Sequence, residues 1–138
     1  MREYLLDTHI IVWLLTGDPR LEGRLRDDIL YYQHQYHVSQ LSLLEMLHLQ
    51  QLGRIALKKT AAEVQDTFLA LNVAVDLASP RTFKTLEKIP MVAINGARHS
   101  DMVDRYLIAD AITHRETLVS ADLKFPHYRK YGLTLLEA

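Results

Sequence analysis

Short runs of apolar residues alternate along the chain with longer stretches in which apolar residues recur at helical spacing. The short runs predict buried strands and the longer stretches predict amphipathic helices. Strands that alternate with helices predict an α/β fold, with a central, mainly parallel sheet that helices cover on both faces. We expect a loop at 89–100, strands at 4–6, 36–39, 73–75, 117–120 and 133–136, and helices at 10–15, 21–33, 42–52, 60–71, 80–88 and 103–112.

Polar residues mark the expected ends of two helices. Thr8 is suited to cap the first helix, which Gly17 and the following Asp-Pro pair would end. Ser42 is expected to open the 42–52 helix, and Gly53 to end it. An acidic residue, Glu45, interrupts the apolar face of that helix and is therefore expected to face the interior. The residues predicted to share this face are Leu41, Leu44, Glu45, His48 and Leu52.

The length and composition limit the classes of protein to consider. With 138 residues we expect a single domain, 1–138, built around one core. There are 17 acidic and 16 basic residues, so the net charge of -1 gives no general attraction for nucleic acid. The absence of cysteine excludes disulfides, thiolate zinc sites and thiol nucleophiles. No apolar run is long enough to span a membrane and no signal peptide is evident, so we expect a cytoplasmic protein.

Acidic residues stand where the predicted fold would gather them. Asp7 and Asp122 follow predicted strands, and ligands of parallel sheets bind beyond the carboxyl ends of the strands. Glu45 faces inward on a helix, and Asp104 lies in the first turn of another. Each has a structural alternative: Asp7 as a helix cap, Glu45 in an ion pair with His48 or an arginine, and Asp122 in a turn. Asp101 and Asp104, three residues apart, could likewise form a capping pair.

Taken together, these carboxylates predict a cation site. Four inward carboxylates would repel one another unless a cation neutralised them or protons bound to them. Oxygen ligands without cysteine favour Mg²⁺ or Mn²⁺ over zinc. Such a site suits hydrolysis of phosphodiester bonds, in which a metal activates water and stabilises phosphoryl charge.

Four segments, in their order along the chain, resemble the motifs of the PIN-domain family, and most closely those of its VapC-type toxins. The similarity covers the chain from Tyr4 to Leu136, and the specificity lies in the ordered set rather than in any one motif. The segments are Leu5-Leu6-Asp7-Thr8-His9 with Trp13-Leu14-Leu15, Ser42-Leu43-Leu44-Glu45, His99-Ser100-Asp101-Met102-Val103-Asp104-Arg105, and Leu118-Val119-Ser120-Ala121-Asp122.

The resemblance implies a Mg²⁺- or Mn²⁺-dependent ribonuclease with a three-layer α/β/α fold. It further implies a homodimer and inhibition by a small antitoxin protein. By motif position, the catalytic and metal-binding residues would be Asp7, Glu45, Asp104 and Asp122. Thr8, Asp101 and Ser120 would be auxiliary residues beside them.

Three positions depart from the family pattern. Met102 stands where a proline is usual, and Leu49 where a lysine commonly follows the helix glutamate, which removes an expected basic contact. Asp110 replaces a small residue and lies too far round its helix from Asp104 to join the site. None of these departures removes a predicted metal ligand.

Basic and aromatic residues near the motifs give weaker signals. Arg105, Lys124 and Arg129 are candidates for RNA backbone contacts, although a structural ion pair is the favoured interpretation of Arg105. His99 is interpreted as a hydrogen-bonding framework residue, and Trp13 as a core residue. The alternative to an enzyme is a PIN-like module that binds RNA or protein without cleavage, which the presence of all four carboxylates disfavours. An aspartyl-phosphate phosphatase or a receiver domain fits poorly, because each needs a second acidic residue near Asp7.

Overall fold

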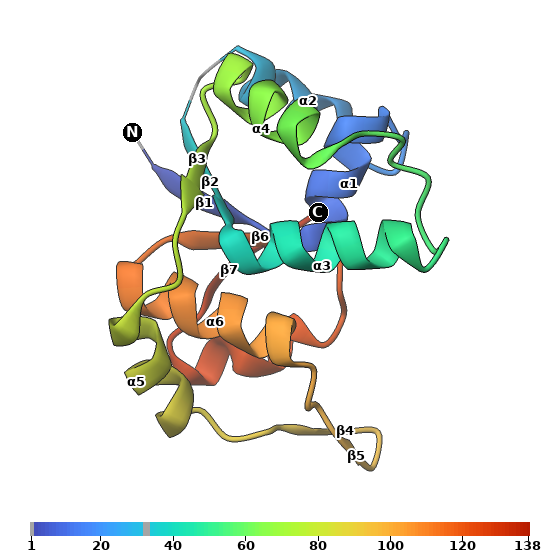
Figure 1. Cartoon of the computed structure of the whole chain (residues 1–138). Coiled ribbons are helices and arrows are strands. Elements are labelled where there is room, and N and C mark those ends of the chain that lie inside the picture. Colours follow the sequence, from blue (N-terminus) through green and yellow to red (C-terminus); the bar gives the residue numbers. More distant parts are fainter. Residues whose placement is uncertain (1, 32–33) are drawn as a thin grey trace.

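A central sheet of five parallel strands organises the structure, a computed structural model that describes residues 2–31 and 34–138 (Figure 1). The strand order is β3-β2-β1-β6-β7, and every neighbouring pair is parallel. The expected α/β class with a parallel sheet is therefore confirmed. The strands are β1 (Glu3–Leu6), β2 (Gln35–Ser39), β3 (Ala74–Asp76), β6 (Thr117–Ser120) and β7 (Thr134–Glu137).

The helices follow the predicted order, with small differences in length. The expected 21–33 helix ends at Leu30, and its predicted last residues, 32 and 33, lie outside the described residues. The expected 89–100 loop contains a two-stranded hairpin, β4 (Ala93–Ile94) and β5 (Ala97–Arg98), that turns at Asn95-Gly96. The helices are α1 (Thr8–Thr16), α2 (Gly23–Leu30), α3 (Gln40–Gln51), α4 (Ala61–Ala70), α5 (Pro80–Lys88), α6 (Met102–His114) and the 3-10 helix η1 (Phe125–Tyr131).

Two apolar clusters, one on each face of the sheet, hold the layers together. Leu6 and Val119 belong to the cluster that includes buried residues of α1 to α4, whereas Leu5 and Leu118 belong to the cluster that includes buried residues of α6 and η1. Helices α1 to α4 lie on one side of the sheet, and α5 and α6 lie on the other (Figure 1). Successive side chains of a strand alternate between faces, so both sides of each central strand are apolar. This arrangement confirms the three-layer α/β/α architecture.

The caps of α1 and α3 differ from the prediction by one and three residues. Asp7, not Thr8, caps α1, and its side chain accepts the Thr8 backbone N–H. Ser39, not Ser42, caps α3 by accepting the Leu41 backbone N–H. Thr8 and Ser42 are instead buried and joined to each other, with Thr8 Oγ1 donating to Ser42 Oγ at 3.0 Å.

The predicted apolar face of α3 was wrong. Leu44 is 65% exposed and Leu52 is 52% exposed, while the buried residues of the helix are Ser42 and Met46. A pattern of apolar side chains could not locate this face, because Ser42 counts as polar in the sequence but is satisfied by Thr8 in the fold. With Ser42 and Met46 facing the core, Glu45 is half-buried rather than fully turned inward.

Candidate active site

Asp7 and Asp122 lie beyond the carboxyl ends of two adjacent parallel strands, β1 and β6. A single hydroxyl connects them. Ser120 Oγ donates to Asp7 Oδ2 at 2.8 Å and accepts the Asp122 backbone N–H at 3.0 Å. The last residue of β6 therefore links the residues that follow both strands.

The Asp7 carboxylate is buried and held at both oxygens. Its side chain is the cap of α1, where Oδ1 accepts the Thr8 N–H at 2.7 Å, and Oδ2 accepts the Ser120 hydroxyl. The residue is only 3% exposed, and this burial raises the pKa of Asp7 to about 6. The two hydrogen bonds oppose the shift because they stabilise the ionised form. The capping alternative is thus correct in geometry, yet capping alone does not compensate the buried charge.

Asp104 has the largest upward pKa shift among the predicted site residues. It lies in the first turn of α6, where Asp101 caps the helix by accepting the Asp104 backbone N–H at 2.9 Å. Burial and then the negative charges of four other acidic residues raise the pKa of Asp104 to about 8. All predicted acidic positions therefore lie within electrostatic reach of Asp104. The four contributing residues are Asp101, Asp7, Asp122 and Glu45.

The Thr8–Ser42 hydrogen bond fixes α3, the helix that carries Glu45. Ser42 lies one turn before Glu45, and its hydroxyl is bonded to the first residue of α1 at 3.0 Å. Because Asp7 immediately precedes Thr8, this bond couples the position of Glu45 to that of Asp7. The auxiliary position of Thr8 thus corresponds to a link between helices.

Hydrogen bonds from Tyr128 to His99 and from His99 to Asp104 orient the Asp104 carboxylate. His99 is 6% exposed, with Nε2 at 3.1 Å from Asp104 Oδ2 and Nδ1 at 2.9 Å from the Tyr128 hydroxyl. The Tyr128 oxygen also accepts the Val92 backbone N–H at 3.4 Å, which leaves the hydroxyl proton for Nδ1 of His99. His99 then donates from Nε2 to Asp104. Burial and the nearby Lys124 lower the pKa of His99, which favours this neutral form.

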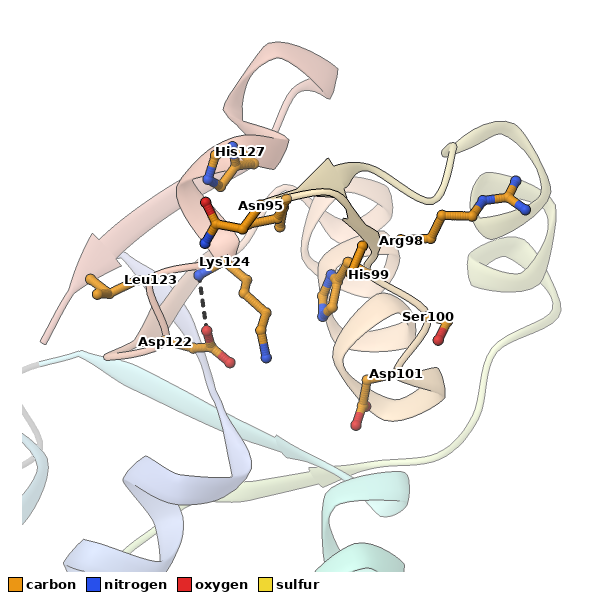
Figure 2. A pocket seen from close by; sticks show the side chains of 11 residues that line it. Asn95, Arg98, His99, Ser100, Asp101, Asp122, Leu123, Lys124 and His127 are labelled. Atoms are coloured by element: carbon orange, nitrogen blue, oxygen red, sulfur yellow. Dashed lines mark hydrogen bonds between the residues drawn. The ribbon is translucent and has the colours of Figure 1, made fainter.

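An open cleft of about 740 Å³ lies beside the acidic residues, between the β4–β5 hairpin and the segment that follows β6. Figure 2 shows Asp122 and Lys124 on one wall and His99 on the opposite wall, with Arg98 pointing away from them. The Lys124 backbone N–H donates to Asp122 Oδ1 at 2.9 Å, so Asp122 also forms the turn considered as its alternative. Lys124 itself lines the cleft.

The other two basic candidates are engaged elsewhere. Arg105 donates from Nη2 to the Ile89 backbone oxygen at 2.8 Å and is half-buried. Among the described residues it forms no ion pair, so the favoured prediction of an ion pair was wrong. Arg129 lies 3.2 Å from Glu137 Oε2, on the β7 side of η1. Arg98, which the sequence did not suggest, lines the cleft with Lys124, and so does His127, whose aromatic neighbours in the sequence made its segment a weak candidate for a single-strand contact.

The donor chemistry of the predicted site fits a hard divalent cation. Asp7, Glu45, Asp104 and Asp122 offer only carboxylate oxygens, the donors preferred by Mg²⁺ and Mn²⁺. Burial raises the pKa of both Asp7 and Asp104, and neighbouring carboxylates raise each further, so the ionised forms are unfavourable in the protein alone. A bound cation would offset their negative charge.

A second group of titratable side chains was not recognised from the sequence. It comprises His37, Asp76, Asp110, His114 and Glu116, and we call it the His37 cluster. Its signal in the sequence was Asp110 and His114, which lie four residues apart on α6. The other members come from three different strands or strand ends, so nothing in the sequence indicated their proximity.

Comparisons with known proteins identify the fold and the family. A search of curated proteins finds no significant match. VapBC2 from Rickettsia felis, solved bound to a promoter DNA fragment, has a TM-score of 0.70 at 17% identity, over 99% of this chain and 98% of its own. VapBC-1 from nontypeable Haemophilus influenzae has a TM-score of 0.67 at 15% identity, over 98% and 97%. A toxin-antitoxin complex from Klebsiella pneumoniae has a TM-score of 0.56 at 16% identity, over 88% of both chains.

These similarities show a shared fold. The family is shown by the sequence, because the model of the PIN domain matches residues 4–131. The match includes β1, α3, α6 and β6, the elements that carry or position the predicted acidic residues. The chain therefore belongs to the PIN-domain family.

Proposed function

We propose that the protein is a metal-dependent endoribonuclease that hydrolyses RNA phosphodiester bonds and acts as the toxin of a toxin-antitoxin pair. The observation that carries the proposal is the convergence of acidic charge on Asp104, whose pKa rises to about 8 under the influence of Asp7, Glu45, Asp101 and Asp122. PIN domains are generally nucleases, and the structures with the same fold include toxin-antitoxin complexes.

In this proposal Asp7, Glu45, Asp104 and Asp122 hold Mg²⁺ or Mn²⁺. A divalent cation held there would lower the pKa of an attacking water and stabilise charge on the phosphoryl oxygens and the leaving group. Ser120 orients Asp7 through its 2.8 Å hydrogen bond, and His99 orients Asp104 through a 3.1 Å contact. Such supporting contacts are the means by which proteins fix the direction of metal-binding carboxylates.

The cleft beside the carboxylates is the proposed path of the RNA strand. Lys124 lies on its wall within two residues of Asp122, where it can neutralise a backbone phosphate next to the reacting group. His127 lines the same cleft and offers a ring for base stacking. Single-stranded RNA is the favoured form of the substrate, because its bases are free to stack on side chains.

A small antitoxin is the proposed protein partner, and a homodimer is the proposed assembly. Leu44 is exposed on α3, the helix that carries Glu45, and Leu52 is exposed at its C-cap; we take these side chains as the apolar surface that the partner contacts. An amphipathic partner helix could cover that surface. No helix formed by the described residues combines the length and apolar character that a bilayer crossing requires.

Cleavage of a labelled total-RNA pool tests the nuclease. The purified protein is incubated with Mg²⁺, with Mn²⁺ and with EDTA, beside Asp7→Asn and Asp104→Asn prepared in the same way. We expect fragments that require metal and that disappear in both variants. Cleavage by either variant at the wild-type rate would show that the site is wrong. The absence of both cleavage and divalent-metal binding would favour the non-catalytic binding module instead.

Expression in a bacterial host tests the toxin role. Induction of the wild-type protein should arrest growth, whereas induction of folded Asp104→Asn to the same level should not. Equal growth after induction of both proteins would contradict toxicity. Gel filtration with light scattering tests the assembly, and a monomer at micromolar concentration would contradict the homodimer.

A further inference from the structure

The His37 cluster lies at the opposite end of α6 from the proposed active site. Asp104 occupies the first turn of that helix, whereas Asp110 and His114 occupy its last turns. Ten residues of α-helix, from Asp104 to His114, extend about 15 Å. The cluster is therefore a separate site, and none of its residues is a proposed ligand of the active-site metal.

The residues of the cluster converge from four elements on one small cavity of about 310 Å³. His37 projects from β2, Asp76 ends β3, Glu116 precedes β6, and the remaining two residues belong to α6. His37, Asp76 and Glu116 each offer a donor atom within 4.8 Å of the others. Asp110, His114 and Glu116 form a second such triad, so Glu116 is common to both.

Glu116 is the residue that points to a missing ligand. It is only 4% exposed, and its Oε2 atom is fully buried without a hydrogen-bond partner. Glu116 Oε2 lies 3.6 Å from His37 Nε2, which is beyond hydrogen-bond length. A buried carboxylate oxygen without a partner is costly, so proteins normally supply a donor or a cation.

The charge of the cavity lining favours a cation. Glu3 joins the cluster at the rim, where its carboxylate lies 3.1 Å from His37 Nε2. Four carboxyl groups and two imidazoles thus line the cavity, and no lysine or arginine is among the lining residues. His37 also contacts Asp76, with Nδ1 at 3.0 Å from the carboxylate. A protonated His37 can offset only one of these four negative charges.

We propose that the His37 cluster binds one divalent transition-metal ion of the zinc class through His37, Asp76 and Glu116. Imidazole nitrogen together with carboxylate oxygen is a ligand set that Zn²⁺ accepts in tetrahedral sites. Asp110 lies beside this set and is held by the Thr82 hydroxyl at 2.6 Å and by His114 at 3.1 Å. The bound ion would join β2, β3 and the residue that precedes β6 through one shared centre.

Calorimetric titration of Zn²⁺ into three variants tests the site. Asp104→Asn disables the proposed active site, Glu116→Gln removes the central ligand of the His37 cluster, and His48→Gln removes an exposed histidine outside both sites. Asp104→Asn and His48→Gln should bind one equivalent as tightly as the wild type. Glu116→Gln should bind at least about tenfold more weakly. Circular dichroism confirms that each variant is folded, and Asp76→Asn, at a half-exposed position, provides a second ligand variant.

X-ray absorption at the zinc edge identifies the donors. One imidazole should appear in the wild type and disappear in His37→Gln. Zinc binding that survives Glu116→Gln but is lost in Asp104→Asn would place the ion at the active site and overturn the proposal. The absence of any zinc binding would also overturn it, since the cluster would then be a network of protonated groups. Neither result depends on RNA cleavage, which Glu116→Gln should leave unchanged.

Discussion

The Ser120 hydroxyl donates a hydrogen bond of 2.8 Å to Oδ2 of Asp7, a residue 113 positions away in the sequence. The same hydroxyl oxygen accepts the Asp122 backbone N–H, so one small side chain determines the relative positions of two proposed metal ligands. The parallel pairing of β1 with β6 makes this contact possible, because it places the ends of both strands side by side.

Ser120→Ala should impair the metal site more than it impairs the fold. The variant removes a hydrogen bond to a buried carboxylate, worth about 1.5–3 kcal/mol in general. We expect Mg²⁺ affinity and cleavage rate to fall about 10–100-fold, as for other supporting contacts of metal ligands. Calorimetry and a cleavage assay measure these effects. Ser120→Thr, which keeps the hydroxyl, is the control; equal activity of Ser120→Ala and wild type would contradict the role assigned to Ser120.

The metal-free protein should lose stability as the pH rises from 3.8 to about 8. The pKa of Asp104 is raised to about 8 in the folded state, so the folded protein holds a proton that the unfolded chain releases above pH 3.8. The stabilising effect of protonation is complete below pH 3.8 and is lost as the pH passes through about 8. Urea unfolding in EDTA at several pH values measures the trend.

Asp104→Asn should flatten this pH dependence, because asparagine does not titrate. The variant should also be more stable than the wild type at pH 8 without metal, since it removes a charge that four acidic neighbours disfavour. Asp66→Asn, on the exposed part of α4, is a matched control that should leave the slope unchanged. If the unfolding free energy of Asp104→Asn depended on pH as it does in the wild type, Asp104 would not be the group whose titration causes this dependence.

Tyr128→Phe should weaken the hydrogen bond through which His99 orients Asp104. The variant removes the hydroxyl that contacts His99 Nδ1 at 2.9 Å, which frees the ring to change its tautomer. We expect a loss of about 1 kcal/mol in unfolding free energy and a lower cleavage rate at saturating Mg²⁺. Tyr131→Phe, the same change at an exposed position of η1, is the control and should alter neither quantity.

Lys124→Ala should weaken RNA binding through lost charge. If Lys124 neutralises one phosphate of a single strand, the slope of log affinity against log salt should decrease in magnitude by about 0.7. Fluorescence anisotropy with a single-stranded RNA, in an Asp104→Asn background that prevents cleavage, measures the slope. Lys130→Ala removes a cation that lies over the Tyr131 ring outside the cleft and should leave the slope unchanged. Equal slopes for both variants would exclude Lys124 from the RNA path.

The sequence by itself determined the fold class, the element order and the positions of Asp7 and Asp122 after their strands. These features follow from local periodicity and from the rule that parallel strands present their carboxyl ends at one edge. The β6 bounds, 117–120, and the α5 bounds, 80–88, were predicted as observed, because each combines an apolar pattern with clear polar or proline boundaries.

Only the tertiary structure decided which polar side chains are satisfied inside the protein. Ser42 can face the core because its hydroxyl forms a hydrogen bond with Thr8. The buried face of α3 therefore includes Ser42 and differs from the face that the leucines predicted. His99 lies between Asp104 and Tyr128 because η1 packs against the start of α6. Glu116 and His37 are 79 positions apart in the sequence but lie within 3.6 Å of each other. They meet because β2, which carries His37, and β6, which Glu116 precedes, flank the same strand, β1. Such contacts depend on the packing of distant segments, which local periodicity does not encode.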